Sequence, residues 1–161
     1  MPITSFHNEH NFLSNFYPSI IIYDGITYPT VEHYFQALKT INKVERQHIA
    51  EASTPGKAKR LGRTITLRDD WETIKVLIMY KGLLQKFLSE DVNPGLGGKL
   101  LATDNELLIE GNNWHDNTWG RCSCSRITCI KAQPGKNYLG LLLMDVRSVC
   151  RAFAETRELR F

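Results

Sequence analysis

Apolar residues along the chain fall into short β-branched runs and longer stretches with helical spacing. Ile20 to Tyr23 and Ile26 to Tyr28 flank Asp24-Gly25, a pattern that predicts a β-hairpin. Apolar residues three and four apart predict long helices over Asp70 to Leu88 and from Leu139 to about Phe153. The apolar stripe of the first includes Ile74, Leu77, Ile78, Leu84, Phe87 and Leu88. That of the last includes Leu139, Leu142, Leu143, Val146, Val149, Cys150 and Phe153.

Capping signals predict three shorter helices between the hairpin and the first long helix. Thr30 is the expected N-cap of a helix through Lys39, a second helix covers Val44 to Ala52, and Thr54-Pro55 opens a basic helix ending near Gly62. Asp69 and Glu72 resemble a capping box, and Leu107 to Ile109 reads as a short buried strand. The predicted fold class is α+β, one helix-rich domain over residues 1–161 with a small β-sheet.

Composition narrows the class of protein. Apolar residues make up 42% and charged residues 23% of the 161 positions, as in ordinary globular domains. No apolar run approaches the roughly 20 residues that span a bilayer, and the first residues lack the layout of a signal peptide. We therefore expect a cytoplasmic protein that does not contact a membrane.

Three of the four cysteines, Cys122, Cys124 and Cys129, are close in sequence, and Cys150 is separate. This arrangement does not suggest a disulfide framework. Paired Cys-x-x-Cys spacing is absent, so we expect reduced thiols on a loop, with no metal and no cofactor. A zinc site that includes His115 is the alternative.

Positive charge is unevenly distributed. No carboxylate lies between Glu51 and Asp69, or between Asp116 and Asp145, although both stretches contain several lysines and arginines. The stretches are either two solvated faces or a positive rim that attracts phosphates.

Two groups of polar residues are candidates for chemistry. Glu32, Gln36 and Lys39 are spaced to share one face of their predicted helix, which is either a catalytic face or an ordinary solvated one. Trp114 to Gly120 places Asp116 between two tryptophans, which suits an aromatic-walled pocket that stacks a base or a ribose. A structural loop anchored by its tryptophans is the alternative.

At these residues the chain resembles the NADAR (YbiA-like) family, and the matches run in order from about residue 4 to residue 152. They comprise Phe12 to Tyr17, Tyr28 to Lys39, Ala58 to Arg63, Asp70-Trp71 with Lys75 and Met79, Lys86-Phe87, Leu100 to Thr103, Leu108 to Glu110, Asp116 with Trp119-Gly120, Gly135 to Gly140, and Leu143 to Arg147. The ordered set carries the resemblance. Relatives often have a glycine-rich loop after Trp119-Gly120, where this chain has a longer, basic and cysteine-bearing stretch from Arg121 to Gln133.

The resemblance implies hydrolysis of an N-glycosidic bond. One branch of the family removes ADP-ribose from guanine bases and reverses modification by an ADP-ribosyltransferase, with which this chain could be paired. Another branch cleaves ribosylamine phosphate intermediates of riboflavin synthesis. The expected partner is therefore an ADP-ribosylated nucleoside or nucleic acid, or a ribosylamine phosphate.

The chemistry of this reaction assigns roles to the candidates. Glu32 and Asp116 are the carboxylates available to stabilise an oxocarbenium-like sugar. Lys39 either anchors phosphate or hydroxyl groups or attacks the anomeric carbon as a Schiff-base nucleophile. Trp71 and Trp119 are the expected stacking walls, and two arginines are suited to a diphosphate. Those arginines are Arg60 and Arg63, and the resemblance adds Gln36, Gly120 and Asn137 as substrate-binding positions.

Two interpretations from other classes stay open. A binding module could recognise ADP-ribose or a modified base without turning it over, and release of free sugar would separate it from an enzyme. A nucleic-acid-binding domain could use the two basic stretches, although the sequence lacks the signatures of the common nucleic-acid-binding folds.

Overall fold

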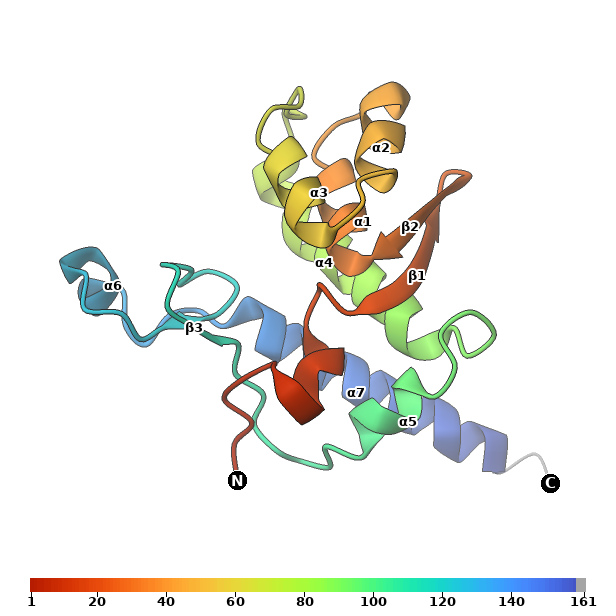
Figure 1. Cartoon of the computed structure of the whole chain (residues 1–161). Coiled ribbons are helices and arrows are strands. Elements are labelled where there is room, and N and C mark those ends of the chain that lie inside the picture. Colours follow the sequence, from red (N-terminus) through yellow and green to blue (C-terminus); the bar gives the residue numbers. More distant parts are fainter. Residues whose placement is uncertain (159–161) are drawn as a thin grey trace. The chain divides into compact units, whose positions relative to one another are not determined.

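The computed structural model describes residues 1–158, so the last three residues of the predicted 1–161 domain lie outside the described part (Figure 1). The chain forms two compact units. The central unit is residues 15–96, and the terminal unit combines residues 1–14 with the chain from Gly97 onward. Whether the two behave as the one domain expected from the sequence stays a prediction.

The central unit begins with the predicted hairpin. β1 (Pro18–Tyr23) pairs antiparallel with β2 (Ile26–Thr30), and Tyr23 lies opposite Ile26. Asp24 and Gly25 both have positive φ, 52° and 77°, as a tight two-residue turn between twisted strands requires. The hairpin prediction is confirmed.

Four helices complete this unit: α1 (Val31–Ala37), α2 (Lys43–Ala50), α3 (Pro55–Leu61) and α4 (Trp71–Leu88). α1 contacts the hairpin and each of the other three helices (Figure 1). The predicted N-caps are confirmed, because the Thr30 and Thr54 side chains accept the backbone N–H groups of His33 and Lys57.

Two boundary predictions in this unit are wrong. α1 ends at Ala37 with Leu38 as C-cap, so Lys39 lies in the following turn rather than on the helix. The N-cap of α4 is Asp70, and no side chain caps it, so the capping box expected from Asp69 and Glu72 does not form.

The buried face of α4 also differs from the predicted apolar stripe. Ile78 and Phe87 are buried as predicted, but Leu77 is 52% exposed, and the buried leucine of the third turn is Leu83 rather than the predicted Leu84. Lys86 lies on this buried face and is fully buried. Position on the face, rather than apolar character alone, decides which of these side chains is covered.

The terminal unit contains the 3₁₀ helix η1 (Asn8–Leu13) and the helices α5 (Leu96–Leu101), α6 (Ile127–Lys131) and α7 (Tyr138–Glu158). Two short strands, β3 (Gly111–Asn112) and β4 (Arg121–Cys122), pair in parallel. Figure 1 shows α6 and β3 together near the N-terminal end of α7. The sequence had not predicted this second sheet.

Two further predictions are corrected in the terminal unit. Leu107 to Ile109 forms no strand: Leu108 makes an isolated parallel bridge with Ile3 and is buried, whereas Leu107 is 44% exposed. The final helix is present, but Phe153 at its predicted apolar face is 56% exposed. The fold class itself, helix-rich α+β with small sheets, is confirmed.

Within the described residues, no helix combines the length and the apolar character that crossing a membrane requires.

Candidate functional site

Two polar side chains of α1 are enclosed rather than solvated. Glu32 is 6% exposed and Gln36 is 4% exposed, one helical turn apart. The Gln36 Nε2 amide donates a 2.8 Å hydrogen bond to Glu32 Oε1. Burying a carboxylate is costly unless its oxygens are hydrogen-bonded, and the bond from Gln36 offsets part of this cost for Glu32. The interpretation of this face as an ordinary solvated one is wrong.

The glycine that caps α3 makes room for this pair. A Cβ atom at Gly62 would lie 2.1 Å from Gln36 Oε1 and 2.9 Å from Gln36 Cβ, closer than side-chain atoms approach one another. A residue with a side chain at Gly62 would therefore displace Gln36. The end of the basic helix and the polar pair of α1 are matched to each other in shape.

Lys39 lies half-buried against two aromatic rings. Its Nζ atom is 6.0 Å from the Phe35 ring centroid and 5.9 Å from that of Trp71, and these rings are 5.0 Å apart. Burial lowers the pKa of Lys39, although the negative charge of Glu32 opposes the shift. The structure thus brings the amine, the carboxylate and one predicted stacking wall into a single neighbourhood.

Positive charges from the α3 region act on the same neighbourhood. Lys59 and Arg63 both lower the pKa of Lys39 further, because a nearby cation disfavours its charged form. Arg63 and Arg60 are exposed, so their guanidinium groups are accessible to a ligand in solution. These cations would attract an anion to this part of the surface without the displacement of any buried group.

The other predicted carboxylate has a different environment in the terminal unit. Asp116 Oδ1 accepts the backbone N–H groups of Thr118 at 2.9 Å and Trp119 at 2.8 Å. The Asn112 side chain bonds the Asp116 main chain at both its N–H and its carbonyl oxygen. These bonds fix the conformation of the loop, and Oδ1 of Asp116 takes part in them as a hydrogen-bond acceptor.

The remaining predicted residues of this unit also join the loop to α7. The Trp119 ring packs edge-on against Tyr138, 6.2 Å between centroids. Asn137 is buried, accepts the Glu110 N–H at 3.0 Å and donates to the Leu108 carbonyl oxygen at 2.9 Å.

Gly120 permits a close backbone approach in the same place, since a Cβ there would lie 2.2 Å from the Glu110 carbonyl oxygen.

The ten predicted site residues divide between the two units. Six lie in the central unit: Glu32, Gln36, Lys39, Arg60, Arg63 and Trp71. Four lie in the terminal unit: Asp116, Trp119, Gly120 and Asn137.

Lys86 is a candidate that the sequence interpretation did not single out. Its side chain is fully buried on α4, with Nζ 5.6 Å from the Tyr17 ring centroid and 5.1 Å from that of Phe87. Burial lowers its pKa to about 7. Its position three residues after Leu83, on the apolar face of α4, is the signal that could have found it.

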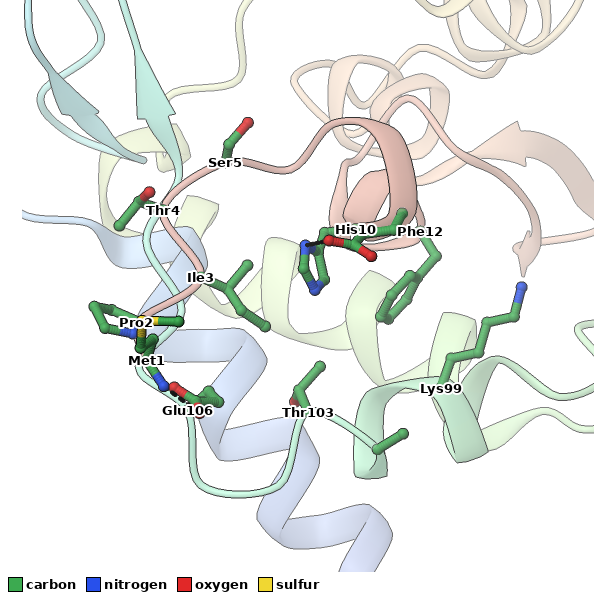
Figure 2. Close-up of a pocket in the computed structure, with 12 residues that line it drawn as sticks. Met1, Pro2, Ile3, Thr4, Ser5, His10, Phe12, Lys99, Thr103 and Glu106 are labelled. Atoms are coloured by element: carbon green, nitrogen blue, oxygen red, sulfur yellow. Dashed lines mark hydrogen bonds and ion pairs between the residues drawn. The ribbon is translucent and has the colours of Figure 1, made fainter.

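A pocket in the terminal unit lies outside the predicted site. Figure 2 shows it between the N-terminal segment and α5, with Ile3, His10, Phe12, Lys99 and Thr103 among its lining residues. The Met1 ammonium forms an ion pair with Glu106 at its edge. None of the ten predicted site residues lines this pocket.

One group of side chains has the donor atoms of a metal site. The potential ligand atoms of His115, Cys122, Cys124 and Cys129 all lie within 4.8 Å of one another. The absence of paired Cys-x-x-Cys spacing had argued against a metal.

Comparison with known proteins decides the family. The profile of the NADAR domain matches residues 4–151, a range that includes most of both units. The chain belongs to the NADAR family. Among its NADAR relatives, N-glycosidase YbiA of Escherichia coli is 37% identical over 142 residues, which cover 87% of this chain and 81% of that protein.

Other relatives have related names. N-glycosidase Npun_R5314 of Nostoc punctiforme is 38% identical over 143 residues, 86% of this chain and 84% of that protein. The chloroplastic riboflavin biosynthesis protein PYRR of Zea mays is 38% identical over 137 residues, 78% of this chain but 20% of that longer protein. The NMR structure of E. coli YbiA matches this NADAR chain with a TM-score of 0.75 and 34% identity, covering 98% of this chain and 87% of that one.

Proposed function

We propose that this chain is an N-glycosidase that removes ADP-ribose from modified guanine bases. The observation that carries the proposal is the buried Glu32 carboxylate, held by Gln36 and electrostatically coupled to the half-buried amine of Lys39. N-glycosidase names among relatives that match most of this chain support the reaction class.

The reaction needs a fixed negative charge beside the sugar. When the C1′–N bond breaks, positive charge develops on the ribose, a water oxygen bonds to C1′, and a proton from that water ends on the departing nitrogen. Glu32 is suited to stabilise the developing cation, since its oxygen is already fixed by Gln36 and need not reorganise. Such pre-organised charges are worth roughly 3 kcal/mol of barrier.

Lys39 has two possible roles in this reaction. Its lowered pKa supports attack on the anomeric carbon of a ring-opened ribosylamine, because only the neutral amine is a nucleophile. In the alternative role its ammonium anchors a phosphate or a hydroxyl group. The ring of Trp71, close to Lys39, is proposed to stack on the base or the ribose.

The basic residues Arg60 and Arg63 are proposed to bind the diphosphate of ADP-ribose. Arg60 and Arg63 carry forked donors that match phosphate oxygens, and both are exposed. Trp119, Gly120 and Asn137 are retained as predicted substrate-binding positions and Asp116 as the second predicted carboxylate. An ADP-ribosyltransferase that produces the substrate is the proposed functional partner, inside the cytoplasm.

A second substrate is favoured by one comparison. The name of the maize relative refers to riboflavin biosynthesis, which supports a phosphorylated ribosylamine as the alternative substrate. Such a compound shares the C–N bond to ribose and one phosphate, so Glu32 and Lys39 would act as before. It lacks the diphosphate, so the arginines would contribute less to its binding.

A product assay tests the proposal. We expect incubation with ADP-ribosylated guanosine to release free ADP-ribose and guanosine, detected by mass spectrometry. A ribosylaminopyrimidine phosphate is assayed in parallel at the same concentration. Release of ribose phosphate from that compound alone would transfer the function to the riboflavin intermediate. Saturable binding of ADP-ribose with no product from either substrate would make the chain a binding module.

A further inference from the structure

We propose that His115, Cys122, Cys124 and Cys129 form a structural zinc site in the terminal unit. These residues come from separate places: the loop after β3, the end of β4, the segment that follows β4, and α6. Folding brings three sulfur atoms and one imidazole nitrogen within 4.8 Å of one another. Three thiolates and one histidine form one of the standard ligand sets of structural zinc.

The distances within the cluster fit tetrahedral coordination. His115 Nδ1 lies 3.1 Å from Cys124 Sγ and 3.6 Å from Cys129 Sγ. Around a tetrahedral zinc with Zn–S of about 2.3 Å and Zn–N of about 2.05 Å, the nitrogen and a sulfur are roughly 3.6 Å apart, and two sulfurs roughly 3.8 Å. Small adjustments of side-chain torsions therefore suffice to place all four atoms around one ion.

The segment that contains the cluster lacks a hydrophobic core of its own. We call residues 113–136 the Cys-rich segment. Its buried side chains are those of Cys122 and Cys129, both 3% exposed, whereas Ile127, Ile130 and Trp114 are 62%, 49% and 48% exposed. Short segments without an apolar core generally need a metal or a disulfide to hold one conformation. Here the side chains that do become buried are ligands.

The backbone of the segment is arranged around the ligands. His115 adopts φ of 71°, in the left-handed region that side chains other than glycine rarely occupy. The Asn117 Oδ1 atom accepts the Cys122 N–H at 3.0 Å, and the Asn112 carbonyl accepts the Ser123 N–H at 2.8 Å. These bonds position Cys122 and the residue that follows it, and zinc ligation would offset the cost of the His115 conformation.

Charge and coordination number indicate a structural role rather than a catalytic one. A zinc ion with three thiolates and a neutral imidazole carries a net charge of −1, and Arg121, Arg126, Lys131 and Lys136 surround it in sequence without an intervening carboxylate. All four coordination positions are filled by the chain, which leaves no position for water or substrate. The site would therefore stabilise the Cys-rich segment and take no part in bond cleavage.

Metal content and cobalt spectroscopy test the site on the full chain. We expect about one zinc per chain in protein purified under reducing conditions. Cobalt(II) added to metal-free protein should give the intense visible bands of a tetrahedral thiolate complex. Cys150→Ser is the matched control, because Cys150 is a buried cysteine of α7 outside the cluster. Cys122→Ser, Cys124→Ser and Cys129→Ser should each bind cobalt at least tenfold more weakly than the wild type and the control.

Limited proteolysis adds a measurement that needs neither a variant nor an activity. Removal of the metal should accelerate cleavage within residues 113–136 at least tenfold and leave cleavage of the central unit unchanged. Wild-type protein that binds neither zinc nor cobalt at micromolar concentration would overturn the proposal. So would equal loss of metal in Cys150→Ser and in the cluster variants. An intact mass two daltons below that of the reduced chain would show a disulfide in place of the metal.

Discussion

The neighbourhood of Glu32 and the Cys-rich segment both enclose polar side chains, but they do so by opposite means. Glu32 and Gln36 are buried because α1 contacts the hairpin and three helices, so the surrounding apolar core excludes water from them. In the Cys-rich segment the isoleucines of α6 stay exposed, and only sulfur side chains are buried. The conformation of the first region is fixed by packing against an apolar core, and that of the second by side chains that are potential metal ligands.

This difference predicts which substitutions change the reaction rate and which change the stability of the fold. When a side chain is packed in a core, one functional atom can be changed and the neighbouring residues keep their positions, because many other packing contacts hold those residues in place. A segment fixed by a few ligands loses its conformation when one ligand is lost. Substitutions near Glu32 should therefore change rates more than stability, and substitutions in the Cys-rich segment should change stability more than rates.

The largest effect is expected from Glu32→Gln. This change keeps the shape of the side chain but removes the charge, so we expect turnover to fall by roughly 100-fold or more, about 3 kcal/mol of barrier. The unfolding temperature should change little. Glu51→Gln, at the exposed C-cap of α2, is the matched control and should keep full activity. Near-normal turnover by Glu32→Gln would remove Glu32 from the mechanism.

The parts of the fold that the sequence predicted are those governed by neighbouring residues. Asp24-Gly25 determines its own turn, and Thr30 and Thr54 bond to N–H groups three residues ahead, so local chemistry sufficed. Helical spacing placed Glu32, Gln36 and Lys39 on one face; Lys39 does lie near Glu32, but it lies in the turn after α1 rather than on the helix.

The parts that were missed depend on residues distant in sequence. The burial of Lys86 follows from what packs on α4, and the partners of Asn137 are backbone groups 27 and 29 residues away. The ligand cluster is the clearest case, since the spacing of its cysteines matches no common motif. Only the parallel pairing of β3 with β4 and the placement of α6 bring the side chains together.

A smaller effect, on stability, is expected from Gly120→Ala. The new Cβ would meet the Glu110 carbonyl oxygen at 2.2 Å, and backbone cannot move aside as a side chain can, so we expect a loss of about 2 kcal/mol of unfolding free energy in urea. Gly98→Ala is the matched control: nothing lies within 4 Å of its Cβ position in α5, and alanine favours helix. Equal stability of the two variants would contradict the close approach at Gly120.

Lys39→Arg should lower activity by at least tenfold, about 1.4 kcal/mol of barrier. Burial lowers the pKa of Lys39, so the neutral fraction of its amine, and with it the rate, should rise with pH up to a pKa below the ordinary lysine value. An arginine stays charged, so this pH-dependent limb should disappear from the variant. Lys57→Arg, at an exposed position of α3, should behave as the wild type.

Borohydride trapping during turnover identifies the amine involved. A reduced adduct mapped to Lys39 supports the nucleophile. An adduct on Lys86 would assign that role to the fully buried lysine of α4. Absence of any adduct, together with more than a tenth of wild-type activity in Lys39→Arg, would leave Lys39 as an anchor.

The smallest effect is expected from Asp116→Asn, and it separates the two possible uses of this carboxylate. Asparagine keeps an oxygen that can accept the Thr118 and Trp119 N–H groups, so the loop should persist and kcat/KM should fall by less than tenfold. Asp116→Ala loses both acceptor contacts and should cost about 1 kcal/mol of unfolding free energy, since two part-buried N–H groups lose their side-chain acceptor. Asp145→Asn, exposed on α7, is the control for removal of a charge alone. If Asp116→Asn instead lost as much turnover as Glu32→Gln while keeping its stability, the charge of Asp116 would act on the sugar, and its carboxylate would have a catalytic use besides the structural one.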